Sequence, residues 1–301
     1  MNHIDIAKEI AHHHSQLQVG RPIHWDDTFN KQDEQYPEIT QAVLRACRRL
    51  GFIEDDAQVI ASAWESQIQR HASFDPLTWP HRSEDFGIRA FPRDDAFAPC
   101  PHHLGLYVVV PDAQWVDRLT QAGVGTVQLR FKSEDKQAIT EQIKWAIKAV
   151  QGTSTLLFIN DFWSLAIEHG AYGVHLGQED MEEAPLEKIK SAGLRLGLST
   201  HGYAEMLKAD AHSPSYMALG AVFPTTLKRM KTAPQGLGRL GAYVELMKGY
   251  PLVAIGGIDE QKIPAVLKTG VRSIAMVRAI TESNQPEMVC KKLMAMMYQL
   301  R

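Results

Sequence analysis

The sequence predicts a compact (β/α)8 barrel, a TIM barrel, with a small, mostly helical extension at its N-terminus. Three observations predict this α/β fold. Eight apolar runs of strand length recur from residue 104 onward, helix-like stretches lie between them, and polar residues gather where the runs end. Strands that are buried on both faces are almost continuously apolar, as these runs are. The first run is not followed by a glycine-rich dinucleotide loop, which favours a closed barrel over an open, doubly wound sheet.

The 198 residues from 104 to 301 are enough for one compact barrel. Helices are clearest at 134–150 and 260–269, and a last helix is expected at 287–300. The eight predicted strands are residues 104–110, 126–131, 155–161, 173–177, 195–200, 216–223, 251–257 and 273–280.

Residues 1–103 differ in composition, being rich in His, Asp, Gln and aromatic side chains. The spacing of apolar residues predicts helices over 38–50 and 55–70, and prolines interrupt 71–103. We therefore expect 1–103 to be a helical extension with a proline-rich linker, whose role the sequence does not indicate. Residues 104–301 are expected to be the barrel domain.

Composition and charge exclude several classes of protein. Acidic residues outnumber basic ones by 35 to 32, so the net charge of −3 gives no electrostatic footprint for nucleic acid or an anionic membrane. The cysteines, Cys47, Cys100 and Cys290, form no C-x-x-C pair, which argues against a disulfide framework or a thiolate zinc site. No apolar run reaches the ~20 residues that span a bilayer, and the N-terminus is unlike a signal peptide. We expect a cytoplasmic protein without nucleic-acid or membrane partners, and its oligomeric state, homo-oligomer included, stays open.

The second predicted strand ends in polar side chains on one face. Gln128, Arg130 and Lys132 alternate with Leu129 and Phe131, so the amide and the two cations point to the same side. In a TIM barrel the active site lies at the carboxyl ends of the strands. This group suits a polyanionic ligand, although a solvated strand end would show the same pattern.

Two aspartates follow the third and fourth predicted strands. Asp161 comes directly after Asn160, and Asp180 follows the strand 173–177. Asp161 would also suit the N-cap of the next helix, which is a common structural role. Because the two carboxylates come from adjacent strand ends, they favour Mg²⁺, which takes one or two carboxylates together with water and phosphate oxygens. We therefore predict Asp161 and Asp180 as ligands of Mg²⁺.

The fifth and sixth predicted strands also end in polar residues. Ser199 offers a hydroxyl and His201 an imidazole, although His201 would equally suit a surface position at a helix start. The sixth strand leads into a long loop that begins with residues 224–228 (PTTLK). A loop of this length inside a compact barrel is usually functional.

Gly256 and Gly257 close the seventh predicted strand, and Val277 and Arg278 lie near the end of the eighth. Loops after these two strands are the usual phosphate site of a TIM barrel, where backbone N–H groups bind the anion. The residues thus predict two anion-binding regions with Mg²⁺ near one of them. One diphosphate and one monophosphate substrate would need such a site, and metal-bound diphosphate is a good leaving group.

These motifs together resemble thiamine-phosphate synthase, the thiamine-phosphate pyrophosphorylase family, over essentially all of 104–301. The resemblance implies a transferase that joins 4-amino-5-hydroxymethyl-2-methylpyrimidine diphosphate to 4-methyl-5-(2-phosphoethyl)thiazole, giving thiamine phosphate and diphosphate. The motifs are QLRFK (128–132), INDFW (159–163), AYGVHLGQED (171–180), GLSTH (197–201), GAVFPTTLK (220–228) with APQGL (233–237), VAIGGI (253–258) and GVRSIAMVRAI (270–280).

The resemblance also implies a role for each matching residue. Its mechanism is dissociative: diphosphate leaves, and the thiazole nitrogen captures the resulting cation. The catalytic residues would then stabilise charge and position substrates rather than transfer protons. The implied residues are Gln128, Arg130, Lys132, Asn160, Ser199 and Lys228 for the pyrimidine diphosphate, with Arg130, Lys132, Ser199 and Lys228 as the catalytic ones, Thr225, Thr226, Leu227, Gly257, Val277 and Arg278 for the thiazole phosphate, and Asp161 and Asp180 for Mg²⁺.

Two positions depart from the family pattern. The family's strand-six motif P-T-x-T-K is here Pro224-Thr225-Thr226-Leu227-Lys228, so one threonine is displaced, and its V-S-A-I is here Val277-Arg278-Ala279-Ile280. Both departures concern the thiazole-phosphate side. Two other functions stay open: a thiazole tautomerase, which shares the barrel, and a non-catalytic sensor of thiamine phosphate. The tautomerase needs no pyrimidine-diphosphate site, and the sensor needs no metal carboxylates.

Overall fold

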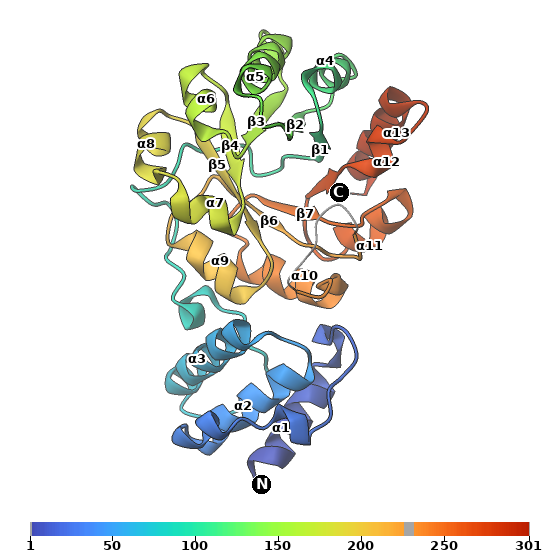
Figure 1. The fold of residues 1–301 in the computed structure, drawn as a ribbon. Coiled ribbons are helices and arrows are strands. Elements are labelled where there is room, and N and C mark those ends of the chain that lie inside the picture. The colour runs from blue at the N-terminus through green and yellow to red at the C-terminus, as the bar shows by residue number, and fades with distance from the viewer. Residues whose placement is uncertain (1, 226–231, 301) are drawn as a thin grey trace.

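A closed barrel of eight parallel strands forms the larger part of the chain, as the sequence predicts (Figure 1). The computed structural model describes residues 2–225 and 232–300. Strands pair in sequence order, and the last pairs with the first to close the barrel. They are β1 (Leu106–Val110), β2 (Thr126–Leu129), β3 (Leu156–Asn160), β4 (Gly173–Leu176), β5 (Arg195–Thr200), β6 (Tyr216–Leu219), β7 (Leu252–Ile255) and β8 (Ser273–Met276).

Helices surround the barrel on the outside (Figure 1). At least one helix follows each strand, which gives the alternating order that the sequence predicts. They are α4 (Ala113–Gln121), α5 (Lys136–Val150), α6 (Trp163–Glu168), α7 (Gln178–Glu183), α8 (Leu186–Ser191), α9 (Tyr203–Asp210), α10 (Gly236–Leu246), the 3-10 helix η5 (Glu260–Lys262), α11 (Ile263–Leu267), α12 (Arg278–Thr281) and α13 (Pro286–Gln299).

Successive side chains of each strand point alternately into the barrel and out toward the helices. In β1, Val108 and Val110 belong to the core between strands and helices, whereas Tyr107 lies inside the barrel. Gln128 of β2 and His175 of β4 are also buried. The barrel region therefore buries polar groups that need hydrogen-bond partners of their own.

The strand ends differ most from the predicted ones at β6 and β8, while β2 and β7 each end two residues early, at Leu129 and Ile255. β6 ends at Leu219 rather than at 223, and β8 ends at Met276 rather than at 280. The apolar run at 273–280 misled the prediction because α12 begins at Arg278 and buries Ile280 as a helical residue. Within the described residues, no helix combines the length and the apolar character needed to cross a bilayer.

The N-terminal extension is built from α1 (His3–His13), α2 (Glu38–Arg49) and α3 (Glu54–His71), drawn in blue in Figure 1. The second and third helices confirm the predictions at 38–50 and 55–70. The helix α2 packs against both α1 and α3. The 3-10 helices η1 (Ser15–Leu17), η2 (Asp26–Thr28) and η3 (Lys31–Gln35) lie between α1 and α2, and η4 (Ser83–Phe86) follows α3.

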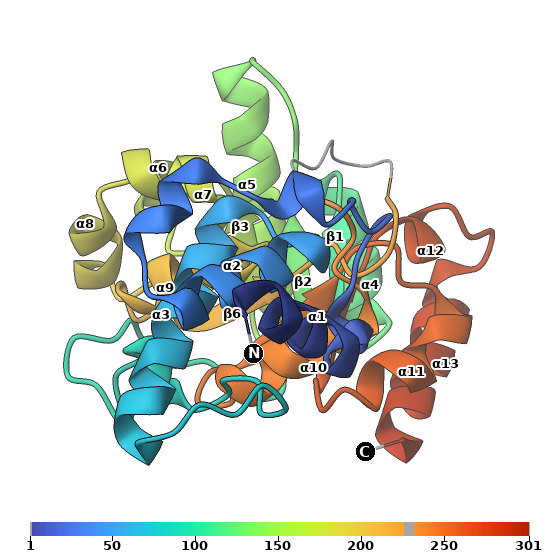
Figure 2. The same ribbon diagram turned by 90° about the horizontal axis from the view of Figure 1, so that it is seen from below.

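The extension lies against one side of the barrel, at α9 and α10 (Figures 1 and 2). The helix α3 contacts α9, and η1 contacts α10. Apolar residues of the extension share one continuous core with the outer layer of the barrel. The division of the chain into two domains at residues 103 and 104 stays a prediction.

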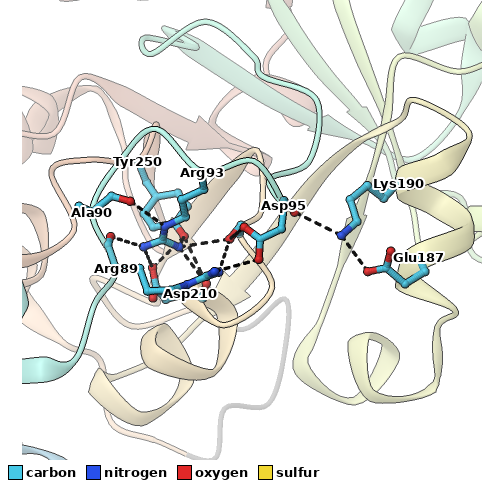
Figure 3. Close-up of polar contacts among 9 residues, drawn as sticks. Arg89, Ala90, Arg93, Asp95, Glu187, Lys190, Asp210 and Tyr250 are labelled. Carbon is cyan, nitrogen blue, oxygen red and sulfur yellow. Dashed lines mark hydrogen bonds and ion pairs between the residues drawn. The ribbon is translucent and has the colours of Figure 1, made fainter.

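The linker between η4 and β1 is tied to the barrel by a buried ion pair (Figure 3). Arg93 Nη2 lies 2.7 Å from Asp210 Oδ1, and the two side chains are only 3% and 7% exposed. The Arg93 guanidinium also donates to the Tyr250 hydroxyl at 2.6 Å and lies over the Phe91 ring. Because breaking a buried pair leaves an uncompensated charge, this contact fixes the course of the linker.

We predict that one buried carboxyl, Asp56 on α3, makes stability depend on pH. Burial raises its pKa from 3.8 to about 6, against the opposing effects of the Ala204 N–H and Arg239. Between these two pKa values the folded state binds more protons than the unfolded state, so this carboxyl lowers stability as pH rises. Relative to Asp56→Asn, the wild-type free energy of unfolding should rise by up to about 3 kcal/mol from pH 7 to pH 4.

Urea unfolding of the full chain at several pH values would measure this difference. Asp55→Asn, at the exposed neighbouring position on α3, is the matched control for removing a carboxylate from this turn. If the difference in the free energy of unfolding between wild type and Asp56→Asn stays constant across this pH range, the prediction is contradicted.

Candidate active site

A cavity of about 530 Å³ opens at the carboxyl ends of the strands. All eight strands or the loops that follow them contribute to its lining. A second depression lies beside it, next to β2 and β3. The main cavity brings together ten of the residues predicted from the sequence: Gln128, Arg130, Asn160, Asp161, Asp180, Ser199, Thr225, Gly257, Val277 and Arg278.

Three predicted residues, Thr226, Leu227 and Lys228, lie outside the described residues, so their roles stay predictions. Lys132 lies in the second depression rather than in the main cavity, together with Asn160 and Asp161. Those two residues line both hollows and therefore connect them.

A chain of buried hydrogen bonds runs across the barrel interior. The Gln128 side-chain amide donates to the Tyr107 hydroxyl at 2.9 Å, and the hydroxyls of Tyr107 and Tyr216 are 2.6 Å apart. From Tyr216 the chain continues to His175 Nδ1 at 2.7 Å. His175 Nε2 then lies 2.8 Å from the Ser199 hydroxyl. The chain links five strands and ends at a hydroxyl that lines the cavity.

The tyrosines in this chain stay uncharged. Burial raises the pKa of the Tyr107 and Tyr216 hydroxyls well above the usual value for tyrosine, so both keep their protons. In one consistent arrangement each hydroxyl donates to the next group, and His175 carries its proton on Nε2 toward Ser199. The two tyrosine hydroxyls thus take part in hydrogen bonds without adding a charge, which suits a polar heterocyclic ring.

The glycine at position 197 of β5 makes room for the Tyr216 ring. A Cβ at this position would lie 2.1 Å from Cζ and 2.4 Å from the hydroxyl oxygen of Tyr216. The same ring packs edge-on against Tyr107 and Phe158. Because the ring is enclosed by these contacts, the hydrogen-bond chain depends on a glycine at the position paired with Tyr216 on the neighbouring strand.

The position of Arg130, the residue directly after β2, is set by a short continuation of the strand pairing. The Arg130 N–H donates to the Val110 carbonyl at 2.8 Å, which extends the pairing of β2 with β1 beyond Leu129. The Arg130 side chain lines the main cavity and the exposed Lys132 lines the second depression. The predicted pair of cations therefore faces two adjoining hollows, which share Asn160 and Asp161 as lining residues.

Asp161 and Asp180 line the main cavity from adjacent strand ends. Asp161 adopts a left-handed backbone, with φ 63°, and its carboxylate accepts a hydrogen bond from the Asn160 amide at 2.5 Å. The following helix, α6, has Phe162 at its N-cap position, so Asp161 lies one residue before that position. The N-cap position predicted as an alternative for Asp161 is therefore occupied by Phe162. Asp180 accepts a hydrogen bond from the Gly177 N–H at 3.3 Å in the first turn of α7.

This donor set suits Mg²⁺ in one specific way. Within residues 2–225 and 232–300, no three His, Cys, Asp or Glu side chains gather into a metal-binding group. Mg²⁺, however, is usually held by one or two carboxylates together with water and substrate phosphates. Two carboxylates on one cavity beside Arg130 match that pattern, and metal binding itself stays a prediction.

A glycine turn after β7 forms the opposite rim. Gly256 and Gly257 have φ of 102° and 64°, a left-handed backbone that side chains other than glycine rarely adopt. A Cβ at Gly256 would lie 2.5 Å from the Ala221 Cβ, and one at Gly257 would lie 2.5 Å from the Pro224 carbonyl oxygen. Both glycines are therefore needed for this turn to pack against the end of β6.

Lys262 is a cation of this rim that the sequence analysis missed. Its ammonium group donates to the Gly257 carbonyl at 2.8 Å and to Asp259 Oδ2 at 2.5 Å. It lines the cavity together with Val277 and the exposed Arg278, which starts α12. The rim formed after β7 and β8 thus carries cations as well as backbone groups.

The end of β5 is held by neighbours on both sides. The Ser199 carbonyl accepts from the Gln178 side chain at 2.7 Å. The His201 N–H and its ring Nδ1 lie 2.9 and 2.6 Å from Glu205 Oε2. His201 lines the cavity and is half-buried, so it is not the surface residue that remained an alternative.

Tyr107, His175 and Tyr216 were also missed by the sequence analysis. Each lies within a mostly apolar strand. From the sequence, a single polar side chain in such a strand cannot be distinguished from an ordinary core residue. The available signal was Gly197, a glycine in the middle of a predicted strand, because such a glycine often marks the close approach of another group.

These observations define an enzyme of the TIM-barrel class with a polar cavity at the carboxyl ends of its strands. A family model described as thiamine monophosphate synthase matches residues 106–280. The thiamine-phosphate synthase of Neisseria meningitidis serogroup A is 54% identical over 200 residues, which cover 66% of this chain and 98% of that protein. The chain therefore belongs to the thiamine monophosphate synthase family and, with it, to the transferases of thiamine biosynthesis.

Further relatives agree. The thiamine-phosphate synthase of Cronobacter sakazakii is 56% identical over 187 residues, covering 62% of this chain and 89% of that protein. The solved structure of a thiamine phosphate pyrophosphorylase from Pyrococcus furiosus is 30% identical with a TM-score of 0.59, covering 65% of this chain and 96% of that one. The matched region of the family model begins at β1, so it leaves out the extension.

We predict that Gly197→Ala disrupts the site from within the barrel. The added methyl group would overlap the Tyr216 ring, so the ring must move and the hydrogen bonds to Tyr107 and His175 must lengthen or break. Overpacking of this kind costs about 1–3 kcal/mol of stability. Thermal unfolding and the rate of product formation would both be measured.

Gly193→Ala is the matched control for adding a methyl group, because a Cβ there meets no atom within 4 Å, although its positive φ adds backbone strain of its own. Equal activity of Gly197→Ala and wild type would show that the position of the Tyr216 ring is unimportant.

Proposed function

We propose that the chain condenses 4-amino-5-hydroxymethyl-2-methylpyrimidine diphosphate with 4-methyl-5-(2-phosphoethyl)thiazole to form thiamine phosphate and diphosphate. The observation that carries this proposal is that one cavity has cations, together with carboxylates, on two rims on either side of a hydrogen-bonded polar interior. One rim has Arg130 and the other has the glycine turn with Lys262 and Arg278. Membership of the family supports the same reaction.

The proposed reaction needs charge stabilisation more than proton transfer. The bond between the pyrimidine methylene carbon and the diphosphate oxygen breaks, and the electron pair leaves with the diphosphate. The thiazole nitrogen then supplies its lone pair to the methylene cation, so atoms and charge balance without a base. Preorganised cations at the leaving group lower the barrier of such a step, and removing one is worth about 3 kcal/mol, roughly a hundredfold in rate.

The pyrimidine side of the proposed site is built on β2, β3 and β5. Gln128 and Ser199, at the two ends of the buried hydrogen-bond chain, would hold the pyrimidine ring. Arg130, Lys132 and Asn160 would hold the diphosphate. Lys228 is assigned to the same substrate from the family motif.

The thiazole side of the proposed site lies across the cavity. Thr225 and the backbone around Gly257, Val277 and Arg278 would hold the phosphate of the thiazole. Thr226 and Leu227 are assigned to it from the motif. The Arg278 side chain, where the family has serine, adds a positive charge at this rim, which offsets the displaced threonine of the strand-six loop.

Asp161 and Asp180 would hold Mg²⁺. When bound, Mg²⁺ would neutralise charge on the departing diphosphate. The protein's own contribution is to hold both carboxylates at one side of the cavity, Asp161 through its left-handed backbone and Asp180 through the first turn of α7.

We also propose that this reaction takes place in the cytoplasm. Cys47, Cys100 and Cys290 are all free thiols, which suits a reducing compartment.

The test is thiamine phosphate formation by the full chain from the two purified substrates, with and without Mg²⁺. Product that requires Mg²⁺ supports the proposal. A chain that binds thiamine phosphate but forms none would instead be a sensor. A chain that isomerises a thiazole phosphate and ignores the pyrimidine diphosphate would be a tautomerase.

We predict that Asp161→Asn and Asp180→Asn each lower turnover at limiting Mg²⁺ by one to two orders of magnitude, roughly the effect of losing one such ionic contact. Asparagine tolerates the left-handed backbone of position 161, so the fold should be kept. Turnover would be measured as a function of Mg²⁺ concentration. Glu179→Gln, which changes the carboxylate next to Asp180, is the matched control, and unchanged rates at limiting Mg²⁺ would remove the two aspartates as ligands.

A further inference from the structure

The helix α9 begins at the rim of the cavity, and its first turn is capped from the extension. The Asp56 carboxylate accepts a hydrogen bond from the Ala204 N–H at 2.9 Å. A Cβ at Gly202 would lie 2.2 Å from the same carboxylate, so the backbone between β5 and α9 is in close contact with α3. Ser199 and His201, which line the cavity, lie a few residues before this contact.

The rest of α9 is held by the extension as well. The Tyr203 ring stacks on Phe86, with ring centroids 5.3 Å apart, and its hydroxyl accepts from the Trp79 indole at 3.1 Å. At the far end, Arg93 of the linker pairs with Asp210 and donates to its carbonyl at 3.0 Å (Figure 3). A helix that is fixed at both ends and along its length cannot shift without moving the extension.

The helix α10 is held in a similar way. Arg239 donates to the carbonyls of Leu17 and Leu50 at 2.8 and 3.0 Å, and its guanidinium lies 3.6 Å from the centre of the Phe52 ring. It also donates to the side chain of Gln235 at 3.2 Å. A Cβ at Gly238 would lie 1.9 Å from the Gln16 carbonyl oxygen, so α10 and η1 are in backbone contact.

The start of α10 is joined directly to the end of β6. The Gln235 N–H donates to the Ala221 carbonyl at 2.8 Å, and the Gly236 N–H donates to the Val222 carbonyl at 2.9 Å. Thr225, which lines the cavity, follows three residues after Val222. The described residues that line the cavity come from 107–282, so the extension acts on the site indirectly, and its contacts with α9 and α10 lie next to the rim.

We propose that the extension positions the substrate-binding rim after β5 and β6 by holding α9 and α10, with Asp56 and Arg239 as the positioning residues. This inference rests on the proposed function, in which Ser199 binds the pyrimidine diphosphate and Thr225 binds the thiazole phosphate. Each positioning residue therefore acts on a different substrate. Asp56 acts through α9 on the first substrate, and Arg239 acts through α10 on the second.

The experiment compares substitutions in the full-length protein. Asp56→Ala removes the cap, whereas Asp56→Asn keeps an oxygen that accepts from the Ala204 N–H. Asp55→Ala, at the exposed neighbouring position, is the matched control. Arg239→Met keeps an unbranched side chain of similar length over Phe52 and removes the donors. Steady-state kinetics for each substrate, thermal unfolding, and hydrogen exchange of peptides covering 199–206 and 232–239 are measured for every variant.

Asp56→Ala is expected to lower kcat/KM for the pyrimidine diphosphate roughly tenfold, a usual size for the loss of a helix cap. Exchange at 199–206 should rise, and KM for the thiazole phosphate should stay constant. Asp56→Asn should restore most of the rate, and Asp55→Ala should match wild type. Arg239→Met should show the reverse pattern, with loss for the thiazole phosphate and faster exchange at 232–239.

Two results would overturn the proposal while wild type is active. One is a folded Asp56→Ala with wild-type kinetics. The other is a loss of rate without faster exchange at 199–206, since the rim would then not have loosened. If wild type makes no thiamine phosphate, the proposed function fails on its own, and the exchange data alone decide whether the extension holds the rim. Unchanged exchange in both Asp56→Ala and Arg239→Met would then refute it.

Discussion

The site depends on the closure of eight strands into a barrel, because closure forces alternate side chains into one small interior. Strand pairing sets which positions face inward, and so Gln128, Tyr107, His175 and Ser199 come from different strands yet join one hydrogen-bond chain. Buried polar groups must be paired, and each side chain of this chain is hydrogen-bonded to the next. The same geometry places Ser199, the last residue of this hydrogen-bond chain, at the cavity, where its hydroxyl can bind a substrate ring.

The acidic and basic side chains lie around this hydrogen-bonded interior. Arg130 comes from the β2 end, Asp161 and Asp180 come from the ends of β3 and β4, and Lys262 with Arg278 come from the β7 and β8 ends. Charges at the mouth remain close to water and avoid the large penalty of burial. The interior can therefore hold a neutral ring while the rims hold phosphate groups. The proposed condensation needs this arrangement, because both of its substrates combine a ring with phosphate.

The sequence predicted the barrel well, because doubly covered parallel strands leave long apolar runs and the rim residues come directly after them. It failed where the same pattern has two causes. The apolar residues at 273–280 were predicted as one strand. The strand ends at Met276, and Ile280 belongs to α12, where it is buried just as a strand residue would be. Asp161 suited both a helix cap and a metal site, and the sequence does not show that α6 begins one residue later, with Phe162 at its N-cap position. The contacts of Asp56 and Arg239 could not be predicted, since they join segments far apart in the chain.

The placement of the extension also has a consequence for the order in which the protein is assembled during synthesis. Arg239 and Leu17 are separated by 222 positions and Trp79 and Tyr203 by 124, yet each pair is in direct contact. Domains synthesised first usually fold first, at about 5–20 residues per second. The helices α1–α3 leave the ribosome many seconds before α10 does. Their apolar surface toward the barrel therefore stays exposed until α9 and α10 have been synthesised. The helices α9 and α10, which are synthesised well after α1–α3, thus complete the surface on which the extension packs.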